Sequence, residues 1–111
     1  MGVNSDRSVR ALDKAPNRPI NPASARAKVI ASLASVGAVV VFDEDTPKEL
    51  ISKIVPDVLV KGGDYDPDET DAAHPKYIVG RNTVLKNGGC IQTVDLVDGF
   101  STTSVINKMK L

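Results

Sequence analysis

The apolar positions along the chain form short runs that alternate between strand-like and helix-like spacing. Val58, Leu59 and Val60 are apolar in succession, which is typical of a strand covered on both faces. Because Met1–Asn4 passes from an apolar residue straight into turn formers, it has the character of the end of a strand. Strands are therefore predicted at residues 1–4, 38–42, 58–61 and 90–94.

Helix signals lie between these runs. Asn21 predicts an N-cap with Pro22 as the first helical position, and apolar residues continue at helical spacing to Ser35. Thr46-Pro47-Lys48-Glu49 is a capping-box pattern that begins a short helix ending near Ile54. That helix is expected to bury Leu50, Ile51 and Ile54.

The remaining segments are a basic stretch, an acidic loop and two further helical regions. Ser5–Pro19 predicts a helical turn at most, followed by a loop, and Asp66–Pro75 predicts a loop. Helical patches within Tyr77–Asn87 end at a Gly88-Gly89 pair. A last helix, capped by Ser101-Thr102-Thr103, should run to about Lys110 and bury Val105, Ile106 and Met109.

Alternation of strands and helices predicts an α/β fold with a parallel sheet of about four strands and helices on both faces. The 111 residues suffice for one small domain. In such sheets ligands bind beyond the carboxyl ends of the strands. We therefore expect Lys61–Tyr65 and Gly99–Thr103 to lie side by side at that edge.

Composition narrows the function classes. The net charge is zero and predicts neither a nucleic-acid partner nor a membrane surface. Charge is uneven, since residues 1–30 carry six Lys/Arg and residues 43–73 carry ten Asp/Glu. Cys90 is the one cysteine, so no intrachain disulfide can form; it is expected to be buried and inert. The chain shows no signal-peptide pattern and no apolar run near the length of a membrane span, and a cytoplasmic location is expected.

Two motifs are candidate ligand sites. Gly62 and Gly63 follow the central strand and would let the backbone adopt positive φ and approach a ligand, with Asp64 and Tyr65 just beyond. Ser101, Thr102 and Thr103 open a helix, where backbone N–H groups and hydroxyls attract anions, and Lys108 follows about two turns on. An ordinary turn and a merely well-capped helix explain the same residues.

Other chemical signals are weaker. The basic set Arg7, Arg10, Lys14 and Arg18 fits a phosphate-binding loop and a solvated turn equally well. His74 is the single histidine and is expected on the surface, and no metal site is predicted. The Lys-Gly-Gly-Asp sequence does not have P-loop spacing.

Taken together, six segments resemble the cytidylyltransferase-like nucleotidyltransferases. In pattern they are most similar to the D-glycero-β-D-manno-heptose 1-phosphate adenylyltransferases, which occur as half of a bifunctional kinase/adenylyltransferase or as separate enzymes. The segments are Val3–Asp6, Arg18–Pro22, Phe42–Pro47, Pro56–Tyr65, Gly88–Gly89 and Gly99–Thr103. The Lys-Gly-Gly-Asp-Tyr and Gly-Phe-Ser-Thr-Thr pair, in this order and spacing, is the most specific part.

The resemblance implies a three-layer Rossmann-like fold and a cytoplasmic enzyme, a homo-oligomer, in ADP-heptose and lipopolysaccharide precursor synthesis. Its substrates would be ATP, with Mg²⁺, and heptose 1-phosphate, and its products ADP-heptose and pyrophosphate. By the same resemblance, Asp64 and Tyr65 would contact the sugar phosphate. Nucleotide-binding residues would be Lys14, Gly62, Gly63, Asp64, Ser101, Thr102, Thr103 and Lys108.

One departure from the family is important. The family carries a His-x-Gly-His signature after its first strand, and this sequence has none, so its catalytic residues stay unassigned. We therefore expect residues 1–111 to form one partial, N-terminally truncated domain that is inactive alone and has a gap or an exposed edge mid-sheet. The alternative is a non-catalytic nucleotide-binding or dimer-forming fragment. A flavodoxin-like regulatory domain is disfavoured because no acidic pocket with a matched lysine is evident.

Overall fold

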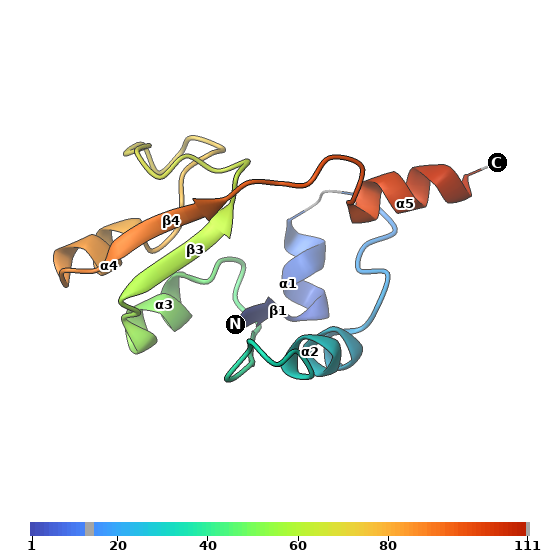
Figure 1. Ribbon diagram of the computed structural model, residues 1–111, viewed down its shortest axis with the longest axis horizontal. Helices are drawn as coiled ribbons and strands as arrows, with labels where there is room; N and C mark the ends of the chain where they lie inside the picture. The colour runs from blue at the N-terminus through green and yellow to red at the C-terminus, as the bar shows by residue number, and fades with distance from the viewer. Residues whose placement is uncertain (13–14, 111) are drawn as a thin grey trace.

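The computed structural model describes residues 1–12 and 15–110, and its elements follow the predicted alternation (Figure 1). Two helices, rather than one, separate the first two strands. In chain order the elements are β1 (Gly2–Asn4), α1 (Asp6–Ala11), α2 (Ala23–Ala31), β2 (Val40–Phe42), α3 (Lys48–Ile54), β3 (Val58–Gly62), α4 (Arg81–Lys86), β4 (Cys90–Val94) and α5 (Thr102–Met109).

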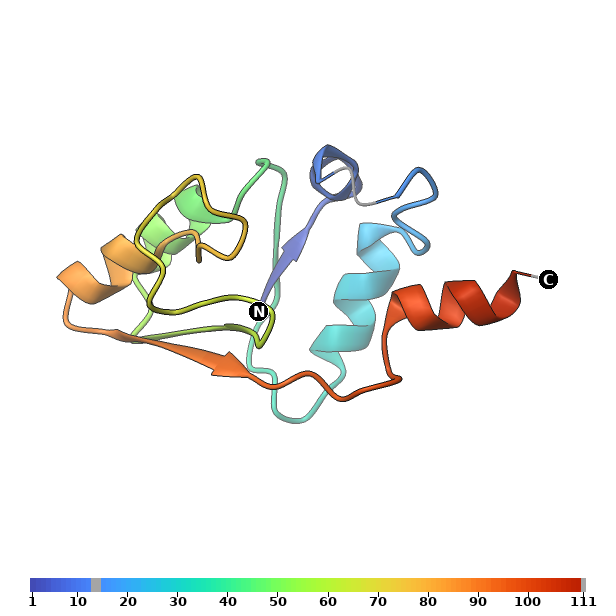
Figure 2. The ribbon, with the colours of Figure 1, turned by 90° about the horizontal axis from the view of Figure 1, so that it is seen from above.

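The described strands form two parallel pairs instead of one sheet. β1 pairs with β2, with Val3 opposite Val41, and β3 pairs with β4, with Val60 opposite Gln92. The prediction of parallel strands is confirmed, but a continuous sheet of four strands is wrong, since no ladder joins β1 to β3 in the described residues. The two pairs are therefore separate sheets in the described part of the chain (Figures 1 and 2).

The well-buried core is small. Among the described residues, the buried apolar side chains are Val3, Phe42, Ile51, Ile78 and Val84. The chain exposes 7955 Å² of surface, whereas about 5,900 Å² is expected for a folded monomer of its mass. Its radius of gyration of 14.9 Å also exceeds the value of about 13 Å for a domain of this length. Much apolar surface thus remains open to solvent.

The central strand β3 is covered on one face only, so the prediction of a strand buried on both faces is wrong. Leu59 is half-buried and lies on the side where α4 packs against β3 and β4. Val58 and Val60 point to the opposite face and are 44% and 52% exposed. The run therefore makes both faces of β3 apolar, but the described residues cover only the face that carries Leu59.

Two helix starts and one helix end differ from the sequence prediction. Pro22 and Pro47, in place of Asn21 and Thr46, occupy the N-cap positions, and neither proline caps its helix through a side chain. Asp6 instead accepts from the Ala23 N–H at 2.9 Å, and Thr46 accepts from the Lys48 N–H at 3.5 Å. Glu49 pairs with Lys53 at 2.9 Å rather than reaching back to the start of α3. α2 ends at Ala31 instead of Ser35, where the following Ser32 hydroxyl donates to the Lys28 carbonyl at 2.7 Å.

Several side chains predicted to be buried are exposed. Ile54 on α3 is 57% exposed, and Val105 and Met109 on α5 are 54% and 76% exposed. Cys90 is also exposed, because its side chain shares the open face of the β3–β4 pair with Val58. α1, with six residues, is longer than the single turn predicted from the sequence.

Local turn predictions are confirmed at two helix ends. Gly88 follows α4 with φ of 82°, and Gly89 donates its N–H to the Val84 carbonyl at 2.9 Å. Ser101 caps α5 by accepting from the Ser104 N–H at 3.0 Å. No helix in the described part of the chain is long and apolar enough to cross a membrane.

Candidate functional site

The hydroxyl-rich start of α5 contacts the basic segment that follows α1. Arg18 donates from Nη2 to Thr103 Oγ1 at 2.8 Å, which joins two residues 85 positions apart. The pair borders a concavity of about 210 Å³, whose lining residues are Ala15, Asn17, Arg18, Thr103, Ile106, Asn107 and Lys110. Arg18 and Lys110 make this concavity cationic.

Arg18 has donor capacity left over. Its Nε atom is buried and has no hydrogen-bond partner within the described residues. An unsatisfied buried donor costs about 1–3 kcal/mol, and a charged acceptor such as a phosphate oxygen would relieve that cost. The arrangement at Arg18 and α5 is therefore suited to hold a small anion or a phosphate group.

The predicted site residues near α5 differ in their contacts and exposure. Ser101 uses its hydroxyl to cap the helix, Thr103 accepts from Arg18, and Thr102 and Lys108 are exposed on α5. Lys14 lies outside the described residues. The sequence-based prediction considered Arg18 only as one of a set of basic residues, and it did not include Lys110 as a lining residue. The signal for Arg18 was its position just before Pro19 in a basic, proline-containing stretch.

The glycine segment at the end of β3 is shaped by packing. Neither Gly62 nor Gly63 has positive φ, contrary to the sequence prediction. A Cβ atom on Gly63 would lie 3.1 Å from the Val94 carbonyl oxygen, so glycine permits the chain after β4 to pass close by. Asp64 is exposed, and Lys61 Nζ lies 4.8 Å from the centre of the Tyr65 ring. Asp64 therefore remains accessible to a ligand.

The two predicted motifs lie apart. Lys61–Tyr65 follows the end of β3, whereas Gly99–Thr103 leads into α5, which extends toward the far end of the molecule in both views (Figures 1 and 2). Gly63 packs against Asp95, while Thr103 contacts Arg18. The expectation that these segments lie side by side is wrong for this structure, because residues 95–100 run outward from β4 before α5 begins.

A second polar cluster lies beyond the carboxyl ends of β1 and β2. Ser5 donates to Asp43 at 2.6 Å, and Arg7 contacts Asp43 at 3.3 Å and Asp45 at 3.0 Å. The Ser5 hydroxyl, followed by Arg7, holds the pKa of Asp43 below its usual value. The pKa of Arg7 is raised, chiefly by its hydrogen bond to Asp45. Arg7 thus forms ion pairs with two carboxylates, which argues against a phosphate-binding role for this residue.

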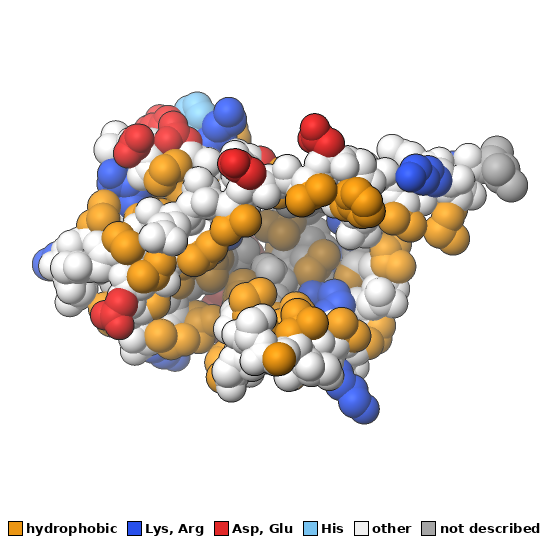
Figure 3. Space-filling model, in the orientation of Figure 1, with side chains coloured by type: hydrophobic (Ala, Val, Ile, Leu, Met, Phe, Trp, Pro, Cys, Tyr) orange, Lys and Arg blue, Asp and Glu red, His pale blue; other side chains and the backbone are white. Residues whose placement is uncertain are grey.

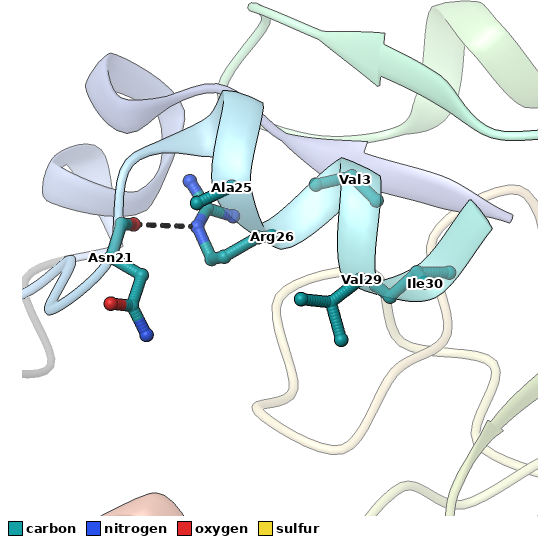
Figure 4. A pocket seen from close by; sticks show the side chains of 6 residues that line it. All are labelled: Val3, Asn21, Ala25, Arg26, Val29 and Ile30. Atoms are coloured by element: carbon teal, nitrogen blue, oxygen red, sulfur yellow. Dashed lines mark hydrogen bonds between the residues drawn. The ribbon is translucent and has the colours of Figure 1, made fainter. Parts of the chain in front are cut away.

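Arg26 ties α2 to β1 and α1. Its guanidinium donates at 2.9 Å to the Asn4 carbonyl and to Asp6. It also donates at 2.9 Å to the Asn21 carbonyl, which is the bond drawn in Figure 4. Beside it lies an open, mostly apolar pocket of about 400 Å³ lined by Val3, Asn21, Ala25, Arg26, Val29 and Ile30. Figure 4 shows Val29 and Ile30 on the α2 side of this pocket. Arg26 therefore fixes the wall of a pocket whose lining is chiefly aliphatic.

His74 lies on the surface, as predicted. Its Nδ1 accepts from the Lys76 N–H at 3.1 Å and lies 3.7 Å from Glu69. In residues 1–12 and 15–110, no group of three or more His, Cys, Asp or Glu side chains is placed to hold a metal ion. The acidic loop instead forms its own turns, in which Asp66 and Asp71 accept backbone N–H groups.

Comparison with known proteins gives a family and a set of relatives. The family model for cytidylyltransferase-like proteins matches residues 1–108. Bifunctional proteins HldE of Haemophilus ducreyi and Mesorhizobium japonicum are 50% and 52% identical over 99% of this chain, and that of Rhodospirillum rubrum is 50% identical over 98%. The chain spans 21%, 20% and 20% of these proteins, about a fifth of their length. Because the family match covers nearly the whole chain, the protein belongs to the cytidylyltransferase-like family of nucleotidyltransferases.

Proposed function

We propose that this domain serves adenylyl transfer from ATP to a sugar 1-phosphate, heptose 1-phosphate, with ADP-heptose and pyrophosphate as products. The product would be a precursor of the lipopolysaccharide core or of another surface glycan. The single observation that carries the proposal is the Arg18–Thr103 contact, which puts a partly unsatisfied guanidinium at the hydroxyl-rich start of α5 in a member of this family.

The chemistry suits such a site. A phosphate oxygen of the sugar 1-phosphate attacks the α-phosphorus of ATP, and the bond from that phosphorus to the bridging oxygen breaks to release pyrophosphate. In displacements of this kind the protein mainly positions the groups and neutralises developing charge. Donors fixed in place before the reaction are the most effective, because they need no reorganisation.

The residue roles follow from position and charge. Arg18 and Thr103 would hold nucleotide phosphates at the start of α5, with Lys108 adding charge without the forked geometry of arginine. Asp64 and Tyr65 would contact the sugar phosphate beyond β3. The full set proposed for the nucleotide is Lys14, Arg18, Gly62, Gly63, Asp64, Ser101, Thr102, Thr103 and Lys108. Catalytic residues are not assigned.

Mg²⁺ would accompany ATP. This ion keeps several water ligands and is usually bound through substrate phosphates and one or two carboxylates. The described residues offer single exposed carboxylates such as Asp64 rather than a cluster of metal ligands. They therefore fit an ion delivered with the nucleotide, whose charge would offset that of the phosphates.

A second candidate function is nucleotide binding without catalysis, as a fragment that also associates with other chains in the cytoplasm. The separation of the described strands into two pairs and the exposed apolar faces favour it. Homo-oligomerisation would cover those faces and is proposed on the same grounds.

The test is an assay of pyrophosphate release from ATP and Mg²⁺ with heptose 1-phosphate, with ADP-heptose identified by mass spectrometry. Because the 111-residue chain is expected to be inactive alone, the variants are compared in a full-length enzyme that contains this domain. There Thr103→Val should reduce product formation, whereas Thr70→Val, a matched change in the exposed acidic loop, should not. ATP binding without pyrophosphate release would support the second function. Absence of both binding and release in the folded chain would contradict both proposals.

A further inference from the structure

The segment between α1 and α2 carries Arg18 but has few backbone donors of its own. Pro16, Pro19 and Pro22 have no N–H group. A backbone bond inside the segment, from the Arg18 N–H to the Ala15 carbonyl, is long at 3.3 Å. The position of the segment must therefore come from side chains that hold its ends.

Arg26 holds the end of this segment that leads into α2. Its Nε donates to the Asn21 carbonyl at 2.9 Å (Figure 4), and its two Nη atoms donate at 2.9 Å to the Asn4 carbonyl and to Asp6. All three nitrogens of the guanidinium are therefore used, one on the segment, one on β1 and one on α1. Asp6 Oδ1 also accepts from the Ala23 N–H at 2.9 Å. The Asp6–Arg26 pair thus ties the end of the segment to β1 and to the start of α1.

The Asp6–Arg26 pair is partly sheltered from solvent. Its side chains are 35% and 24% exposed, against 71% and 51% in the pair of Asp43 with Arg7. A sheltered, charge-assisted hydrogen bond is stronger than an exposed one. The backbone beside Asp6 is fixed as well, because the preceding residue, Ser5, donates its N–H to a β2 carbonyl at 2.8 Å. The pair therefore anchors the segment to the β1–β2 sheet.

Arg18 lies three residues before the anchored Asn21. Three residues of chain span at most about 10–11 Å, and Pro19 between them has a fixed φ. A displacement of Asn21 must therefore move Arg18, whose Nη2 donates to Thr103 Oγ1 at 2.8 Å. Figure 3 shows basic side chains in the space between α2 and α5. The Asp6–Arg26 pair thus determines where the guanidinium of Arg18 lies relative to α5.

We infer that Asp6 and Arg26 are positioning residues that hold Arg18 at the start of α5, where it meets the phosphates of the nucleotide. The inference rests on the proposed function and adds two residues that act through Arg18 rather than on the ligand. Donors that are fixed before binding lose little freedom when a phosphate group arrives, so the anchor contributes to affinity. Without the anchor, the segment has to be ordered at each binding event.

A double-mutant cycle on ATP binding, measured by titration calorimetry with Mg²⁺, tests the inference. Asp6→Ala removes the acceptor for both of its bonds to α2 and should raise the Kd for ATP about tenfold, as expected for residues of one hydrogen-bond network. In the Arg18→Met background the same change should alter the Kd by less than about twofold, because the residue through which Asp6 acts is gone. An effect on stability alone would be equal in both backgrounds.

The position of the segment can be measured without nucleotide. Asn17 on the segment and Asn107 on α5 both line the concavity. Asn17→Cys and Asn107→Cys, combined with Cys90→Ser to remove the exposed native thiol, give two thiols for a short bismaleimide. Cross-linking within one chain, identified by mass, should slow about fivefold or more with Asp6→Ala, because the effective concentration of one thiol near the other falls. Arg26→Lys should slow it similarly, since an ammonium group keeps the charge but cannot serve three separate acceptors.

Glu49→Ala is the matched control. It also removes one carboxylate from an ion pair, but that pair, with Lys53 at 2.9 Å, is exposed and lies on α3. Glu49→Ala should leave the Kd for ATP and the cross-linking rate within about twofold of the original values. Circular dichroism reports whether each variant folds, and Asp6→Asn, which keeps the size of the side chain, replaces Asp6→Ala if the latter does not.

The inference is overturned if Asp6→Ala leaves the cross-linking rate unchanged, or if it raises the Kd equally with and without Arg18. An original cross-linking rate in Arg26→Lys, or effects of Glu49→Ala as large as those of Asp6→Ala, would also overturn it. If the original chain binds no ATP, the proposed function fails, and the placement of Arg18 by the anchor is then decided by the cross-linking rates, which involve no nucleotide. The two failures are therefore distinguishable.

Discussion

Arg18→Met should weaken ATP binding far more than it weakens the fold. Within residues 1–12 and 15–110 of the unliganded chain, Arg18 makes one side-chain hydrogen bond, to Thr103, and that bond is exposed to solvent. Its buried Nε has no partner among the described residues. The same side chain therefore contributes little to stability and has a donor that is not used within the described residues.

The substitution should affect the stability of the fold and the affinity for ATP by different amounts. Loss of the exposed Arg18–Thr103 bond should cost about 0.5–1 kcal/mol of the free energy of unfolding. Loss of the unsatisfied buried Nε should return about 1–3 kcal/mol, so stability should be unchanged or raised. Loss of charge-assisted hydrogen bonds to a phosphate should cost about 1.5–3 kcal/mol of binding free energy, which is about 10- to 150-fold in Kd. Arg18→Lys should fall between the two, because lysine keeps the charge but not the fork.

Titration calorimetry with ATP and Mg²⁺ gives the Kd, and urea unfolding gives the stability of each variant. Arg10→Met is the matched control, since Arg10 is an exposed arginine on α1. A Kd within twofold of the original chain for Arg18→Met, with unfolding unchanged, would refute the role given to Arg18. A similar loss in Arg10→Met would show a general charge effect instead.

Three further outcomes are expected. Gly80→Ala should destabilise the chain by about 2–4 kcal/mol in urea unfolding, because φ at Gly80 is 88° and a Cβ there would lie 2.6 Å from the Ile51 side chain on α3. Gly88→Ala should cost about 1–2 kcal/mol, because φ at Gly88 is 82° but a Cβ there would meet no atom within 4 Å. The lowered pKa of Asp43 means that its stabilising contribution is complete above about pH 4 and is lost as pH falls toward the folded-state pKa; Asp43→Asn should flatten the fall in thermal midpoint at acid pH. In a completed, full-length enzyme, Asp64→Ala and Thr102→Ala should each lower pyrophosphate release while circular dichroism stays unchanged, and normal release in both variants would contradict their assignment to the site.

Interactions between near neighbours in the chain could be predicted from the sequence. Ser101 caps α5 and Gly88 follows α4 with positive φ as expected, because both depend on residues within one turn. The strand at residues 90–94 was also predicted with its observed bounds. The family resemblance, drawn from the same local motifs, agrees with the family match over residues 1–108.

Burial and the composition of the site were decided by the tertiary structure. The apolar run at β3 indicated two covered faces, yet only one is covered, since burial depends on elements distant in sequence. Cys90 is exposed for the same reason. The Arg18–Thr103 contact joins residues 85 positions apart, and the carboxylate partners of Arg7 lie on the loop after β2. Periodicity determines which face of an element is apolar, and caps determine where a helix begins and ends. Only the packing of distant segments determines which residues contact that face and which partners each charged side chain has.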